Sequence, residues 1–110
     1  MTDKERKKIV HHEDICILLG ETYVKKNNDY GDSFSKLRDE FPEAILIRIF
    51  DKYSRLKTLM QGTKQQVNDE SIEDSLMDLA NYCIMEIVER RCGDKGIVSK
   101  KEPVEIEVTK

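Results

Sequence analysis

Residues 70 to 92 read "ESIEDSLMDLANYCIMEIVERRC", and this stretch decides the fold. Successive residues of an α-helix are rotated by about 100°. At that rotation one face of the segment is apolar, with Ile72, Leu76, Leu79, Cys83 and Ile87. The opposite face, here called the acidic stripe, holds Glu70, Asp74, Asp78 and Asn81. Two opposed faces of this kind predict a long amphipathic helix.

The rest of the chain is also predominantly helical in pattern. We expect helices over residues 9–26, 33–41, 42–60 and 69–92. Asn27 and Asn28 are predicted to end the first helix, since Asn favours caps and turns. The prediction is an all-α fold: a small helical bundle of three main helices and a short one. The predicted divisions are a flexible N-terminus (1–8), the helical domain (9–95) and an extended tail (96–110), in which "VEIEV" has strand periodicity.

Composition limits the classes of function. Charged residues make up 37% of the 110-residue chain, but the net charge is only −3, which argues against nucleic acid as the main partner. No apolar run has the length of a membrane span. The three cysteines predict reduced thiols in the core of a cytoplasmic protein. The broad apolar arcs of the helices predict a homodimer or higher homo-oligomer.

Apolar residues border the acidic stripe on both sides: Met77, Ile84 and Val88 on one, Tyr82 and Met85 on the other. An ordinary solvated face is the alternative, but these borders predict a helix that is covered nearly all round. Its acids would then face an interior, a cleft or a partner subunit, and a row of buried carboxylates needs a cation or a base beside it. Carboxylate oxygens suit Mg²⁺ or Mn²⁺.

The preceding helix carries a complementary basic stripe of Arg48, Lys52 and Arg55, with Asp51 beside it. One interpretation is that these cations pair with the acids of the following helix. The other is that they bind phosphate oxygens, which the planar fork of Arg matches, while Asp51 adds a metal ligand. The second interpretation predicts a nucleotide site between the two helices.

A turn with the sequence "DYGDSF" follows the first predicted helix. Tyr30 could stack on a base, and Asp29 or Asp32 could contact a sugar or a base edge. The alternative is a helix cap in which Tyr30 covers the core. A single Gly does not make a phosphate-binding loop.

Three ordered motifs, "KNNDYGDSF", "IRIFDKYSRLKTL" and "ESIEDSLMDLANY", resemble the nucleotide modification associated domain family of phages and their bacterial hosts. More loosely, "EDSLMDLANY" is similar to the acidic third-helix motif of the MazG-like all-α nucleoside triphosphate pyrophosphatases. That resemblance implies Mg²⁺-dependent hydrolysis of a nucleoside triphosphate. It also implies catalytic and metal-binding roles for Glu70, Asp74 and Asp78, with Asn81 near the nucleotide.

The chain departs from the MazG-like pattern on the preceding helix. A Glu-x-x-Glu pair is expected there, and this chain has Asp51 among basic residues. Glu21 and Asp14 are the acids that the first helix could supply instead. Three hypotheses follow: a pyrophosphohydrolase, a non-catalytic nucleotide-binding or regulatory module, and a structural oligomer whose stripes form salt bridges between subunits.

Overall fold

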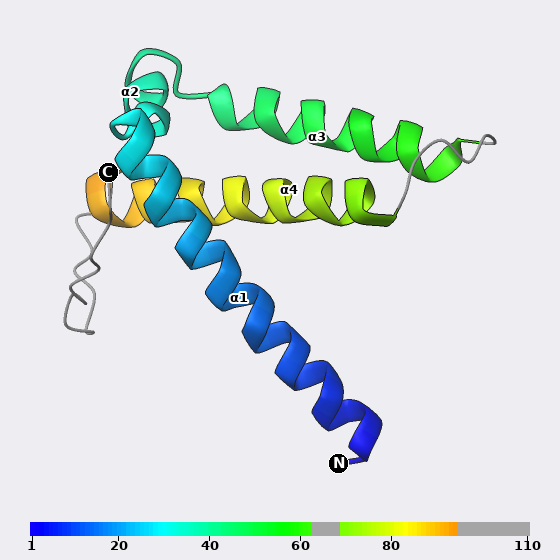
Figure 1. Cartoon of the computed structure of the whole chain (residues 1–110). Helices are drawn as coiled ribbons and strands as arrows, with labels where there is room; N and C mark the ends of the chain where they lie inside the picture. The colour runs from blue at the N-terminus through cyan, green and yellow to red at the C-terminus, as the bar shows by residue number, and fades with distance from the viewer. Residues whose placement is uncertain (63–68, 95–110) are drawn as a thin grey trace. The chain divides into compact units, whose positions relative to one another are not determined.

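The computed structural model describes residues 1–62 and 69–94 (Figure 1). Every regular element in these two ranges is a helix, so the predicted all-α fold is confirmed. The described chain divides after Asp32 into two compact units, here called the N-terminal unit and the hairpin unit and taken in turn. The predicted strand-like tail lies outside the described residues, as does most of the predicted loop before residue 69.

In its described residues the N-terminal unit consists of one long helix, α1, which spans Asp3–Tyr30. It begins six residues before the predicted start because Thr2 and Glu5 form a capping box. The Glu5 N–H donates to the Thr2 hydroxyl at 3.1 Å, and the Thr2 N–H donates to the Glu5 carboxylate at 2.9 Å. These two bonds satisfy donors that a helix start otherwise leaves unpaired.

Helix α1 ends later than predicted, at Tyr30 rather than at Asn27–Asn28. Gly31 adopts the left-handed conformation with φ 62°, and its N–H donates to the carbonyl of Asn27. The N–H of Asp32, whose φ is 58°, donates to the same carbonyl at 3.2 Å. The cap residue is therefore the Gly, which reaches this conformation without steric cost, and both Asn residues stay helical.

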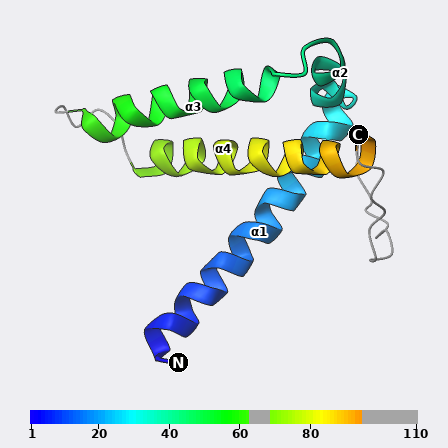
Figure 2. The same ribbon diagram turned by 180° about the vertical axis from the view of Figure 1, so that it is seen from behind.

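Over residues 33–62 and 69–94 the hairpin unit has three helices, α2 (Ser33–Glu40), α3 (Ala44–Gln61) and α4 (Asp69–Glu89), followed by a π-helical turn over Arg90–Asp94. The short α2 matches its prediction to within a residue. Helices α3 and α4 lie side by side and run antiparallel (Figures 1 and 2).

Helix α3 begins at Ala44, two residues after Pro42, the predicted first residue of the helix. Pro42 and Glu43 instead form a turn, which the N–H of Ala44 closes by donating to the carbonyl of Phe41 at 2.9 Å. Proline thus shapes the connection from α2 and does not enter the helix. Gly62 follows α3 in an extended conformation, and the helix ends at Gln61, one residue beyond the predicted range.

The core of the hairpin unit is small and contains Phe34, Ala44, Ile45 and Leu56, all buried. The prediction that the cysteines belong to the core is wrong, because Cys16, Cys83 and Cys92 are all exposed. No helix in the described ranges is long and apolar enough to cross a membrane.

The prediction that α4 is covered nearly all round does not hold within this chain. Leu76, Ile84 and Ile87 are exposed, as is Asp74 of the acidic stripe. The sequence pattern shows where the apolar side chains lie on the helix, but a two-helix hairpin buries only the side of each helix that faces the other.

Candidate functional site

A row of polar contacts joins α3 to α4, and it is here called the polar ladder. Its three contacts follow one another by one turn: Arg48 with Tyr82, Lys52 with Asp78, and Arg55 with Ser75. The guanidinium carbon of Arg48 lies 5.7 Å from the Tyr82 ring centroid. Lys52 Nζ lies 3.3 Å from Asp78 Oδ2, and Arg55 Nε donates to Ser75 Oγ at 3.0 Å. The whole predicted basic stripe therefore meets α4.

The ladder lies at the edge of the hairpin and not in its core. The Asp78 side chain is 41% exposed and that of Lys52 is 21% exposed, while Arg48 and Arg55 are classed as exposed residues. An ion pair with this much access to water adds little stability. The cations can therefore exchange partners with a solvent-borne anion at small cost.

Ser75 gives the ladder its one deeply buried polar group. It is 2% exposed, and its hydroxyl donates to the Ser71 carbonyl at 2.9 Å while accepting from Arg55. The hydroxyl hydrogen is thus committed to the helix backbone, and its oxygen faces α3. This arrangement fixes the position of the Arg55 guanidinium along α4.

The structure does not gather the predicted metal ligands into one site. Asp74 and Asp51 are exposed, and Asp78 contacts Lys52. Glu70 lies in the first turn of α4, but its side chain is outside the described part of the structure. Among the described residues, no group of three or more His, Cys, Asp or Glu side chains could hold a metal ion. In this arrangement they do not fit Mg²⁺ or Mn²⁺ without further ligands.

The remaining predicted site residues divide between the two units. Asn81 is half-buried on α4, one turn beyond Asp78. Asp29 and Tyr30 occupy the last turn of α1 in the N-terminal unit, and both are exposed. An exposed Tyr30 does not support the alternative in which its ring covers the core.

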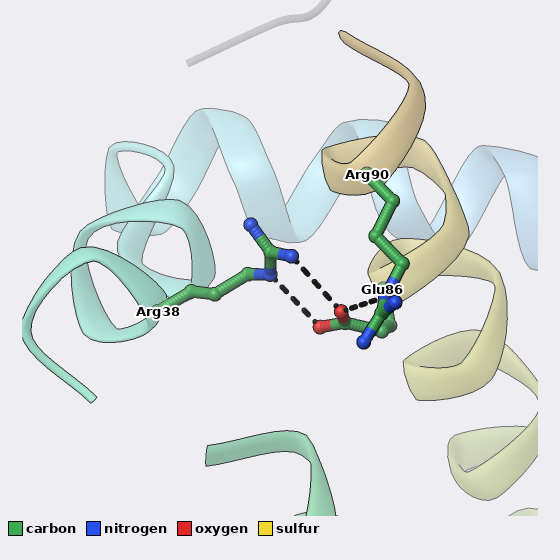
Figure 3. Close-up of polar contacts among 3 residues, drawn as sticks. All are labelled: Arg38, Glu86 and Arg90. Atoms are coloured by element: carbon green, nitrogen blue, oxygen red, sulfur yellow. Dashed lines mark hydrogen bonds and ion pairs between the residues drawn. The ribbon is translucent and has the colours of Figure 1, made fainter. Parts of the chain in front are cut away.

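A second polar cluster was not predicted, and it centres on Glu86 (Figure 3). Arg38 of α2 binds the Glu86 carboxylate through two bonds, from Nε at 2.9 Å and from Nη2 at 3.0 Å. Arg90 adds a third bond from Nε at 2.7 Å. The Glu86 side chain is only 9% exposed, so three charge-assisted bonds hold a nearly buried carboxylate.

The two arginines set the charge state of Glu86. The hydrogen bond from Arg38 is the main influence that lowers the pKa of Glu86, and Arg90 adds to it, while burial acts in the opposite direction. The result is a carboxylate that stays ionised and ties α2 to the end of α4.

Sequence offered only part of the signal for this cluster. Glu86 and Arg90 are four residues apart, a spacing that favours an ion pair on a helix. Arg38 lies 48 residues away in the chain, and no local pattern relates it to Glu86. Tyr82 connects the two polar regions, because its ring lies 6.1 Å from that of Phe34 on α2 and also under Arg48 of the ladder.

Comparison with protein families identifies the class of protein. The family model "Nucleotide modification associated domain 1" matches residues 26–89, more than half of the chain. The match covers α2, α3, α4 and the polar ladder, together with the end of α1. The chain therefore belongs to the nucleotide modification associated domain 1 family. No curated protein and no solved structure gives a significant match.

Proposed function

We propose that this domain binds the phosphate groups of a nucleotide at the polar ladder. The observation that carries the proposal is the partly exposed Lys52–Asp78 pair, with the guanidinium groups of Arg48 and Arg55 one turn to either side. Three cations spaced along one helix edge suit the several oxygens of a di- or triphosphate. The family description, which concerns nucleotide modification, supports the same ligand class.

In this proposal each cation has a distinct role. Lys52 turns from Asp78 toward a phosphate, while Arg55 stays aligned by Ser75 and presents its remaining N–H groups. Arg48 keeps its place over the Tyr82 ring. Asn81, one turn beyond Asp78 on α4, is proposed to contact the sugar or base. For the N-terminal unit, taken by itself, we propose that Tyr30 stacks on a base and that Asp29 contacts a sugar or base edge.

Hydrolysis of a nucleoside triphosphate to monophosphate and pyrophosphate is the more specific candidate. Asp74 and Asp78 stand one turn apart on α4, on the acidic stripe beside the ladder. Mg²⁺ or Mn²⁺ would need a third ligand, from Glu70, Asp51 or the nucleotide itself. Because the described side chains do not complete a metal site, no catalytic step is assigned to a metal, and non-catalytic binding is the function that the geometry supports best.

Calorimetric titration with the common nucleoside triphosphates, with and without Mg²⁺, tests the binding proposal. Arg55→Met is expected to weaken binding at least about tenfold, since hydrogen bonds to charged groups contribute roughly 1.5–3 kcal/mol. Lys36→Met is the control, because it removes a positive charge from an exposed position on α2, outside the ladder.

Release of pyrophosphate and phosphate in the same samples separates the two candidates. Binding without release supports a binding or regulatory module. Pyrophosphate release that Asp74→Asn abolishes supports the hydrolase. No binding of any nucleotide, with or without Mg²⁺, would contradict the proposal.

A further inference from the structure

Helix α3 carries exposed apolar side chains that follow a coiled-coil spacing. Leu46, Phe50, Tyr53 and Met60 are all more than half exposed, and they are separated by four, three and seven residues. Only Lys57 occupies the remaining position of this repeat. A seven-residue repeat with two apolar positions is typical of a helix that packs along its length against another helix.

Helix α4 carries a second stripe with the same spacing. Leu76, Cys83 and Ile87 are exposed and are separated by seven and four residues. The half-buried Ala80 fills the position between the first two. These residues lie on the apolar side that the sequence predicted for this helix, but packing against α3 leaves them exposed.

The two stripes lie on the same side of the hairpin. Successive residues are rotated by about 100° around the helix axis. Around its own helix axis, each stripe lies roughly 130–150° from the ladder residues, measured in the sense in which the chain winds. Because α3 and α4 run antiparallel, the same sense of rotation on both helices leads to one common side. Leu46, Phe50, Tyr53, Met60, Leu76, Cys83 and Ile87 therefore form a single surface, here called the apolar face.

We propose that the apolar face docks against the apolar face of a second copy of this chain, so that two hairpins form a four-helix dimer. A large side chain has an accessible area of roughly 200 Å² when fully exposed. With the exposed fractions of its residues, the apolar face has an accessible area of about 700 Å². That area exceeds the largest apolar patch of a typical monomer. It approaches the ~800 Å² that each partner contributes to a standard stable interface.

Charge and spacing favour a second copy over a different partner. A two-fold interface brings a surface against itself, so like charges would meet across it. Lys57 is the one charged side chain within the two stripes that make up the apolar face, so few like charges would meet there. Two antiparallel helices with coiled-coil spacing match the geometry of half a four-helix bundle. This inference does not depend on nucleotide binding.

Light scattering coupled to size exclusion, at micromolar concentration and without nucleotide, tests the inference. The wild-type chain is expected at twice its 12.9 kDa mass, and Phe50→Glu is expected at 12.9 kDa. Ile47→Glu is the matched control, because Ile47 and Phe50 are both 69% exposed on α3 and Ile47 lies outside the apolar face. It should leave the dimer intact.

Two further measurements keep the test decisive. Far-ultraviolet circular dichroism checks that Phe50→Glu remains helical. If Phe50→Glu does not fold, Met60→Lys, at the end of the α3 stripe, is used in its place. The melting temperature of the wild type should also rise with protein concentration, as it does when unfolding includes dissociation. A monomeric wild type overturns the inference. This holds also if Phe50→Glu lowers the melting temperature of that monomer, because the face would then be covered by another segment of the same chain. A mass that both variants leave unchanged overturns it equally.

Discussion

Two carboxylates of α4, Glu86 and Asp78, lie about two turns apart and are held in opposite ways. The Glu86 side chain is 9% exposed and receives three hydrogen bonds from two arginines. Asp78 is 41% exposed and pairs with Lys52 at 3.3 Å. Its burial and its three hydrogen bonds make the Glu86 carboxylate a contact that holds helices together, whereas the Asp78 carboxylate is accessible to a ligand.

The spacing of carboxylates along a helix does not show which of them the fold buries. The residues of the acidic stripe recur every three or four positions, whereas Glu86 follows a run of apolar residues. The isolated carboxylate is the one that the fold buries and neutralises. Leaving a buried charge unpaired costs several kcal/mol, so such a group survives only with dedicated partners.

The largest effect that we predict is on Glu86. Glu86→Ala is expected to lower the free energy of unfolding by about 3–5 kcal/mol, because it leaves the mostly buried Arg38 guanidinium without its carboxylate. Asp78→Ala, the matched truncation of the more accessible acid, is expected to cost no more than about 1 kcal/mol. Urea unfolding of both variants measures the difference. Equal losses would remove the distinction between the two carboxylates.

A smaller effect is expected from acid. Because the pKa of Glu86 lies below its usual value near 4.5 in the folded chain, its ionised form stabilises the fold at neutral pH. This contribution is present above about pH 4.5 and is lost as the pH falls toward the lower folded pKa. In urea unfolding from about pH 6 to about pH 3, the wild type should lose more stability than Glu86→Gln. Parallel curves for the two proteins would be evidence against this linkage.

Tyr30 provides a smaller test at the end of α1. Its side chain is exposed, so Tyr30→Ala is expected to leave the melting temperature nearly unchanged. If the ring stacks on a base, as proposed, the same substitution weakens nucleotide binding by roughly 1–3 kcal/mol. Both quantities are measured on one preparation. Early melting with normal affinity would instead assign Tyr30 a structural role.

The sequence predicted the helices well because their signals are local. The predicted ranges 33–41, 42–60 and 69–92 differ from the bounds of α2, α3 and α4 by at most three residues at either end. The two differences at the ends of α1 also have local causes. The Thr2–Glu5 capping box was present in the sequence, and Gly31 was a better cap than the two Asn residues before it.

Tertiary relations could be predicted only in part. The opposed stripes of α3 and α4 anticipated contacts such as Lys52–Asp78. The Arg38–Glu86 bond could not be anticipated, since it depends on the turn through Pro42 that returns the chain from α2. The exposure of Cys83 was missed because apolar periodicity locates a face without telling what covers it.

The Glu86 cluster ties α2 to the end of α4, and the polar ladder is proposed to bind nucleotide phosphates. A crossed comparison of Lys52→Met and Arg38→Met, each measured for melting temperature and nucleotide affinity, tests these two roles most directly. Lys52→Met should lose affinity at least about tenfold and keep its melting temperature. Arg38→Met should melt earlier and, while folded, bind normally. Lys52→Met with normal affinity, or Arg38→Met with wild-type stability, would contradict the account.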